Sequence, residues 1–221
     1  MESRHVFITG GTGYIGRSLI PKLVSRGHTV RALVRPESQV KLPVGATAVS
    51  GNALDASSFA LRVPPADTFV QLVGVSHPSA AKAEQFRTVD LAAARAGIDA
   101  AGQAGVRHFV YVSVAHPAPV MHAFIDARRE AEQYLRASGL HFTVLRPWYV
   151  LGPGHRWPYL LLPFYAICGR LGRTRESALR LGLLSLNHMT AALLWAVENP
   201  SREPRALGVS EIRAITRPAA V

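Results

Sequence analysis

A glycine-rich segment near the N-terminus has the residue types and spacing that bind a phosphorylated ligand. It reads Thr9-Gly10-Gly11-Thr12-Gly13-Tyr14-Ile15-Gly16 and lies between a β-branched run and a helix-compatible run. The first glycine of this spacing allows a tight turn, the second lets a pyrophosphate approach the backbone, and the third lets a helix pack close to a sheet. The N–H groups at the start of such a helix attract phosphate. The segment therefore predicts a dinucleotide-binding turn.

The end of the next strand-like run indicates which dinucleotide is bound. Proteins that bind NAD usually place an acidic residue there, on the ribose hydroxyls, but this chain has Arg31-Ala32-Leu33-Val34-Arg35. An arginine can pair with a 2′-phosphate. The sequence therefore predicts NADP(H), with NAD(H) as the alternative. Arg35 is the first choice for the phosphate contact and Arg31 the second, and a plain surface charge at Arg35 is the competing interpretation.

Short β-branched runs alternate with longer amphipathic runs through the first two thirds of the chain. This pattern predicts an α/β fold, a doubly wound and mostly parallel sheet with helices on both faces. The predicted strands are 4–9, 29–34, 46–50, 68–73, 107–113 and 142–145, and the predicted helices are 14–26, 83–104, 121–138 and 187–198. We expect residues 1–147 to form a Rossmann core. Residues 148–221 should form a smaller substrate-facing part, whose helix packs back on the core as one structural unit.

Composition and charge narrow the class of protein. A chain of 221 residues with 48% hydrophobic and 18% charged residues suits one compact domain. The net charge of +11 attracts polyanions, but the basic residues are scattered without interleaved aromatic residues, so nucleic-acid binding is not expected. Cys168 is the only cysteine, and neither a leader nor a membrane-spanning run is apparent, so we expect a cytoplasmic protein. The histidine spacing predicts no metal site, and the oligomeric state is left open.

Further motifs support the glycine turn. They are Gly51-Asn52-Ala53-Leu54-Asp55 after the third strand, Gly74 after the fourth, Tyr111-Val112-Ser113 in the fifth, the segment 128–140, and Leu145-Arg146-Pro147 followed by Gly152-Pro153-Gly154. Together these motifs resemble the atypical, extended-type short-chain dehydrogenase/reductase superfamily, above all its NmrA-like and complex I subunit-like NAD(P)-binding proteins. The resemblance implies that Asn52 and Ala53 lie near the adenine, Val73 and Gly74 near the adenosine ribose, and Ser113 near the nicotinamide.

The catalytic tyrosine and lysine that the resemblance implies are replaced. Aligning the family's YxxxK pattern through Glu132 puts Phe124 at the tyrosine position and Arg128 at the lysine position. Phenylalanine has no proton to donate, and a guanidinium can orient a ligand but is a poor acid at neutral pH. We expect Ser113, Arg128 and Tyr149 to be the catalytic residues. The candidates for a substitute acid are His116, His122, Tyr149 and His155.

The apolar, aromatic run 157–168 suggests what the substrate is. It suits an apolar substrate pocket, a buried helix or a surface patch, and the arginines that follow leave a peripheral membrane contact open. The leading hypothesis is an NAD(P)H-dependent oxidoreductase that reduces a small, apolar carbonyl or quinone-like compound. A quinone can take its proton from solvent, so it does not need the missing tyrosine. The alternative, which Phe124 favours, is a non-catalytic NADP(H)-binding redox sensor or assembly factor.

Overall fold

The protein is built around a parallel seven-stranded sheet. The computed structural model describes residues 2–152 and 181–216, and the strand order is β3-β2-β1-β4-β5-β6-β9. The strands are β1 (His5–Thr9), β2 (Thr29–Val34), β3 (Ala46–Ser50), β4 (Thr68–Gln71), β5 (His108–Val112), β6 (Phe142–Leu145) and β9 (Arg205–Leu207). A separate parallel pair consists of β7 (Tyr149–Leu151) and β8 (Leu183–Ser185). The predicted doubly wound α/β fold is confirmed.

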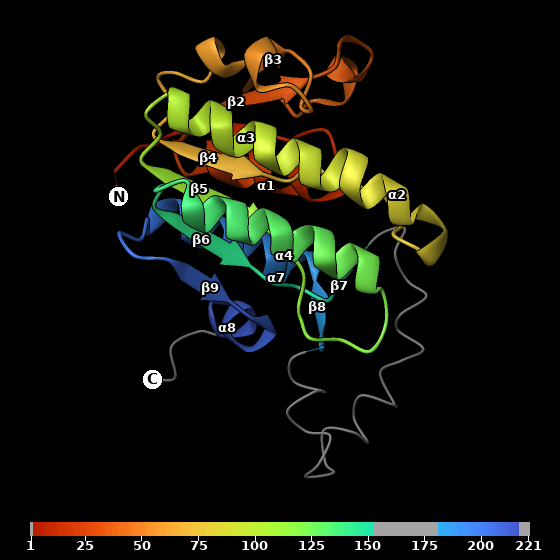
Figure 1. Ribbon diagram of the computed structural model, residues 1–221. Helices are drawn as coiled ribbons and strands as arrows, with labels where there is room; N and C mark the ends of the chain where they lie inside the picture. The colour runs from red at the N-terminus through yellow and green to blue at the C-terminus, as the bar shows by residue number, and fades with distance from the viewer. Residues whose placement is uncertain (1, 153–180, 217–221) are drawn as a thin grey trace, which may run out of the picture.

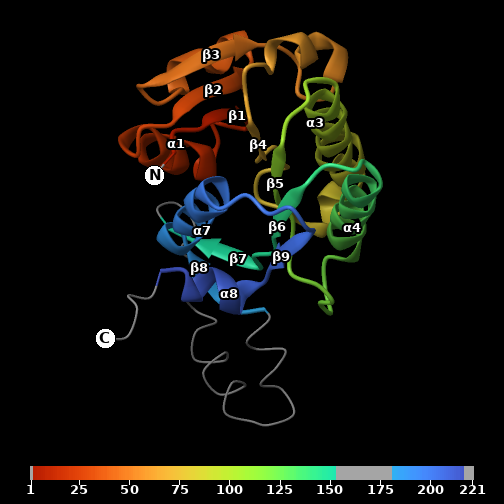
Figure 2. The ribbon, with the colours of Figure 1, turned by 90° about the vertical axis from the view of Figure 1, so that its left-hand side faces the viewer.

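Helices cover both faces of this sheet (Figure 1). They are α1 (Tyr14–Ser25), α2 (Ala83–Gln85), α3 (Ala92–Gln103), α4 (His122–Ala137), α7 (Leu186–Glu198) and α8 (Val209–Ala214), with the 3₁₀ turns η1 (Pro36–Lys41), η2 (Ala56–Ser58), η3 (Ala60–Arg62) and η4 (Ala80–Lys82). A π-helical turn, η5 (Phe86–Leu91), joins α2 to α3. Figure 2 shows α1 and α7 on one face of the sheet and α3 and α4 on the other.

Several elements differ from the prediction. The run 83–104 is helical from Ala83 to Gln103, but Phe86–Leu91 form the π turn η5. The short elements β7, β8 and α8 were not predicted, and β4 ends at Gln71 rather than at residue 73. The strand β9 was missed as well. It has only three residues and follows Pro204, so it is too short to show an alternating pattern. It pairs with β6 and extends the sheet at that edge.

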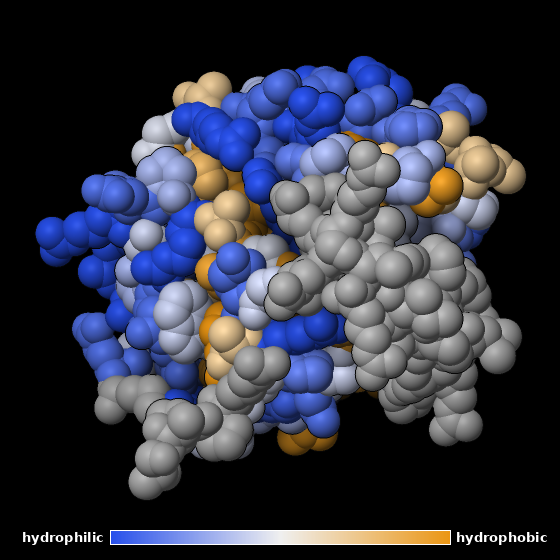
Figure 3. All heavy atoms as spheres, turned by 90° about the horizontal axis from the view of Figure 1, so that it is seen from below, coloured by the Kyte–Doolittle hydropathy of each residue, from blue (hydrophilic) through white to orange (hydrophobic). Residues whose placement is uncertain are grey.

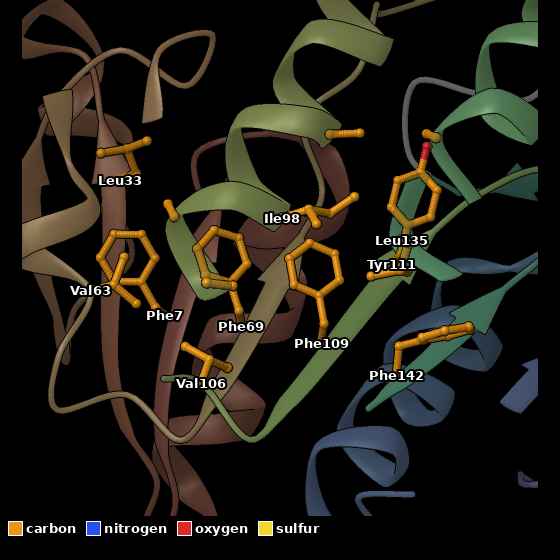
Figure 4. Packing of buried hydrophobic residues seen from close by; sticks show 14 of the residues in the cluster. Phe7, Leu33, Val63, Phe69, Ile98, Val106, Phe109, Tyr111, Leu135 and Phe142 are labelled. Carbon is orange, nitrogen blue, oxygen red and sulfur yellow. The ribbon is translucent and has the colours of Figure 1, made fainter. Parts of the chain in front are cut away.

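The core on the α3 and α4 side becomes polar toward the carboxyl ends of the strands. Phe7, Phe69 and Phe109 lie side by side on β1, β4 and β5, with neighbouring ring centroids 5.3 and 5.1 Å apart (Figure 4). Two residues further along the same three strands stand Thr9, Gln71 and Tyr111, which occupy the same face because strand side chains alternate. The hydroxyl of Thr9 donates to the side-chain oxygen of Gln71.

The opposite face is closed by a helix from the far end of the chain. The α1 residues Leu19, Ile20 and Leu23 share one apolar cluster with Met189 and Leu193 of α7. In addition, Lys22 Nζ donates to the hydroxyl of Thr190 at 2.7 Å. These contacts hold α1, the helix that follows the glycine turn, between the sheet and α7.

Within residues 2–152 and 181–216, no helix is long and apolar enough to cross a membrane. The face seen in Figure 3 is mostly hydrophilic, and its hydrophobic side chains form narrow groups between hydrophilic ones.

His108 makes the stability of this fold depend on pH. Its Nε2 lies 3.0 Å from the hydroxyl of Thr143, and burial, followed by the charges of Arg205 and Arg4, lowers its pKa from 6.5 to about 4. Between these values only the unfolded chain takes up the proton. The contribution of the neutral, buried His108 to the free energy of unfolding is therefore complete above about pH 6.5. It is lost as the pH falls to about 4, and the loss amounts to up to about 3 kcal/mol.

Urea unfolding at pH 7.5, 5.5 and 4 measures this loss. His108→Asn cannot titrate and should lose clearly less stability over the same range, whereas the same substitution at the exposed His5 should leave the wild-type slope unchanged. Equal slopes for wild type and His108→Asn would contradict the assignment.

Candidate cofactor-binding and catalytic site

The glycine turn has the backbone geometry that its sequence predicts. Gly10 has φ +75°, and a Cβ there would lie 2.8 Å from the carbonyl carbon of Leu72 and 2.9 Å from the nitrogen of Val73. A Cβ on Gly16 would lie 2.5 Å from the Gly10 oxygen and 2.6 Å from the Gly11 Cα. The turn is therefore pressed against the end of β4 on one side and against α1 on the other. Neither contact tolerates a side chain.

The start of α1 is suited to an anion. Its cap is Gly13, no side chain caps it, and its first turn contains no acidic residue. The N–H groups and the positive end of the helix dipole of this 12-residue helix therefore remain for a phosphate. The end of the small sheet lies over the same place, because a Cβ on Gly152 would collide with the hydroxyl of Tyr14.

The other predicted cofactor contacts follow neighbouring parallel strands and so lie at the same edge of the sheet. The strand order reverses between β1 and β4, which is where doubly wound sheets form their ligand crevice. Arg35 follows β2, is exposed, and pairs with the exposed Glu37 at 3.3 Å. Arg31 instead donates to the carbonyl of Pro64. The geometry therefore favours Arg35 over Arg31 for a ligand contact.

A cleft lies beside the segment of the predicted adenine contacts. Asn52 and Ala53 follow β3, and the Asn52 side-chain oxygen accepts from the N–H of Leu54 at 3.0 Å. The cleft has about 550 Å³ and runs between the η2 segment and α3, with apolar and charged walls that include Leu54, Leu91, Asp55, Arg87 and Arg95. None of the predicted cofactor contacts lines this cleft. The features that fit a dinucleotide are therefore the glycine cradle and the uncapped start of α1.

Arg128, which the sequence predicts to lie on the nicotinamide side, forms a buried ion pair. One amino group of its guanidinium bonds to Asp90, and the other donates to the carbonyl of Val112 at 2.7 Å. Asp90 also accepts from the N–H of Val75 at 2.9 Å. A Cβ on Gly74 would collide with the guanidinium, so Arg128 lies directly against the segment after β4. Burial opposes its charged form, but Tyr111 and Asp90 together raise the pKa of Arg128 above its usual value.

Ser113 directs its hydroxyl proton into the protein. It donates to Glu132 at 2.7 Å, and both side chains are buried. Arg146 donates to both oxygens of the same carboxylate. Burial opposes ionisation of Glu132, but the hydrogen bonds from Arg146 and Ser113 lower its pKa below the usual value. In this arrangement the Ser113 hydroxyl proton is engaged in the hydrogen bond to Glu132.

The structure places the other catalytic candidates in different surroundings. Phe124 packs edge-on against Phe86, with ring centroids 5.0 Å apart. His116 has Nε2 at 3.7 Å from Glu132, and burial followed by the charge of Arg146 lowers its pKa. Tyr149 lies in β7 against Trp148, and burial raises its pKa. His122 is exposed at the start of α4, and His155 lies outside the described residues.

Three charged residues at this site, two of them buried and one half-buried, were not predicted from the sequence. They are Asp90, Arg146 and Glu132, which served only as an alignment point. A signal for Asp90 does exist, because it lies on the buried face of the helical run, four residues after Phe86 and four before Ala94. An acid on an apolar face needs a buried partner, and this partner is Arg128. Within residues 2–152 and 181–216, no group of acidic, histidine or cysteine side chains could hold a metal ion.

The fold and the site together define a Rossmann-type dinucleotide-binding protein. The family model for NAD(P)H-binding proteins matches residues 10–155, which include the glycine turn and Arg128. The chain belongs to this NAD(P)H-binding family, within the short-chain dehydrogenase/reductase superfamily.

Relatives and solved structures agree with this membership. The chain is 30% identical over 151 residues to the ceramide reductase of Caulobacter vibrioides, covering 67% of this chain and 47% of that protein. It is 28% identical to the photosystem II assembly factor Ycf39 of Synechocystis, covering 64% of this chain and 43% of that protein. The chain thus spans about half the length of these relatives. The fold is similar to that of the Bordetella bronchiseptica enzyme WbmH in complex with NAD⁺, with a TM-score of 0.69, 21% identity, and coverage of 94% of this chain and 76% of that one.

Replacing Gly16 tests the geometry of the cofactor turn. In Gly16→Ala the new methyl group must displace backbone atoms of Gly10 and Gly11, so we expect NADPH affinity to fall at least about tenfold and the protein to lose about 2 kcal/mol or more of stability. Gly102→Ala is the control. It lies in α3 with nothing within 4 Å of the added methyl group and should gain up to about 1 kcal/mol without changing affinity. Calorimetric titration and urea unfolding measure both effects, and unchanged binding in Gly16→Ala would exclude this turn as the phosphate site.

Proposed function

We propose that the protein is an NADP(H)-dependent oxidoreductase that delivers hydride to a small, apolar acceptor such as a quinone. The observation that carries this proposal is that the three positions of the family's catalytic pattern offer no proton. Ser113 donates to Glu132, Phe124 has no acidic group, and Arg128 is held by Asp90 and the Val112 carbonyl. An acceptor that needs no acid from the protein therefore suits the site.

The chemistry of such an acceptor is compatible with these residues. Bound NADPH supplies a hydride. A quinone that takes up a hydride becomes a hydroquinone anion, which takes its proton from water. The protein then has to bind and orient the cofactor and the acceptor, and it has to exclude competing reactions. The ceramide reductase among the relatives carries a lipid in its name, which supports an apolar substrate here by analogy only.

The choice of NADP(H) rests on Arg35. Its guanidinium stands exposed after β2, where the ribose of a bound dinucleotide lies in this fold, and a planar guanidinium matches a 2′-phosphate well. Glu37, its present partner, is also exposed, and such surface pairs are worth about 1 kcal/mol or less. A 2′-phosphate can therefore displace Glu37 easily.

Substitution of Arg35 tests the phosphate contact. Wild type should bind NADPH more tightly than NADH, and Arg35→Asp should lower NADPH affinity at least about tenfold while changing NADH affinity little, because only NADPH carries the 2′-phosphate. Calorimetry with NADPH, NADP⁺, NADH and NAD⁺ measures this. Arg107→Asp makes the same charge change just before β5, at the amino ends of the strands and so opposite to the glycine turn. It should leave the preference for NADPH over NADH intact. A preference that survives Arg35→Asp would assign the phosphate elsewhere.

A second function has specific support. Ser113 and Arg128, whose hydrogen bonds to Glu132 and Asp90 leave no acid for catalysis, also suit a protein that binds NADP(H) without turnover. Such a protein would be a redox sensor or an assembly factor. Ycf39 is named an assembly factor, so relatives of both kinds exist. Binding is common to both functions, and turnover separates them.

Turnover assays distinguish the two functions. With NADPH, wild type should reduce naphthoquinones above background but not simple aldehydes or ketones. Phe124→Tyr combined with Arg128→Lys should gain carbonyl reduction of about tenfold or more, because it supplies the phenol that the site lacks. If wild type binds NADPH but reduces neither class, the non-catalytic function is the correct one.

A further inference from the structure

The buried pair of Arg128 and Asp90 has an electrical consequence for the site. Asp90 is 1% exposed and Arg128 7% exposed, so water screens neither charge effectively. The guanidinium also lies 5.8 Å from the Tyr111 ring centroid and 5.1 Å from that of Phe124, so aromatic rings surround it. Arg128 keeps its charge at all physiological pH values. The net charge at this position of the site therefore depends on Asp90, which compensates the charge of Arg128.

The same pair connects the segments that surround the nicotinamide half of the proposed cofactor site. Asp90 comes from the π turn η5, where an irregular helix aims its carboxylate at the N–H of Val75 and at the guanidinium. Arg128 in turn donates to the carbonyl of Val112, directly before Ser113. Irregular π turns of this kind concentrate at functional sites. Beside this pair, the charge of Glu132 is compensated by Arg146.

Cofactor redox state changes one charge near this position. The nicotinamide ring is a cation when oxidised and neutral when reduced, whereas the phosphates and the adenine half are the same in both forms. A fixed charge near the ring therefore changes the affinity for the oxidised form relative to the reduced form. A disturbance of the rest of the site weakens both forms alike.

We propose that Asp90 is a positioning residue that cancels the charge of Arg128 and thereby sets the relative affinities for oxidised and reduced cofactor. The proposal rests on the proposed function, in which Arg128 lies beside the nicotinamide half. With Asp90 in place the pair is neutral, and the oxidised ring is not repelled. Without it, the unpaired guanidinium disfavours the oxidised form.

Charge substitutions in the pair test this proposal through the ratio of dissociation constants for NADP⁺ and NADPH, measured by calorimetry. Asp90→Asn leaves a net charge of +1 and should raise the ratio on the order of tenfold. Arg128→Gln leaves −1 and should lower it by a similar factor. The double variant is neutral and should return to the wild-type ratio even if both affinities fall. A tenfold change corresponds to about 30 mV in the potential of the bound two-electron couple.

The control removes a carboxylate from another arginine pair. Glu130 on α4 pairs with Arg95 at 2.7 Å and Arg87 at 3.5 Å on the surface, and Glu130→Gln should leave the ratio unchanged. If the unpaired charge in a single variant prevents folding, the remaining single variant and the double variant still give the direction of the shift. A ratio that stays constant across the pair variants would overturn the proposal. Failure of wild type to bind either form would overturn the proposed function itself.

Discussion

The contact between Gly16 and the backbone of Gly10 and Gly11 determines how the rest of the molecule is arranged. Because a hydrogen atom takes the place of a side chain there, the first turn of α1 rests on the glycine turn and its N–H groups lie at the end of β1. Gly10 brings the same turn against the segment after β4, which in turn lies against Arg128. One close backbone approach thus connects the glycine turn, the strand crossover and the segment that contacts Arg128.

The surroundings of Arg128 and Ser113 are organised by charge compensation rather than by a free acid. Two buried carboxylates, Asp90 and Glu132, come from different helical segments, and each is matched by an arginine. Burying such groups is costly unless every partner is present, so these pairs fix the loops that carry them as well as the local charge. In the proposed function such a site binds and orients the dinucleotide, and the chemistry comes from the cofactor and the acceptor, in agreement with the phenylalanine at position 124.

The fold was largely predictable from sequence because its signals are local. Strands β2, β3 and β6 have the predicted bounds, and the glycine turn has the geometry that its spacing requires. Within the site, the sequence predicted only the part whose geometry is set by backbone conformation, which is the glycine turn. The partners of Ser113 and Arg128 lie 19 and 38 residues away in sequence, and local pattern cannot pair side chains over such distances. β9 was missed because three residues are too few to show a period, and the π turn η5 lies within a run whose sequence pattern is helical.

The packing of α1 against α7 also constrains the order of folding. The glycine turn is complete after the first 16 residues, but the apolar face of α1 shares its core with Met189 and Leu193. Contacts that join segments about 170 residues apart form late, because a long loop must close first. Until α7 has been synthesised, Leu19, Ile20 and Leu23 can pack only on the strand residues of this cluster and lack their contacts with α7. A cofactor that binds the turn early would then act as a folding template, holding α1 on the sheet before its second neighbour exists.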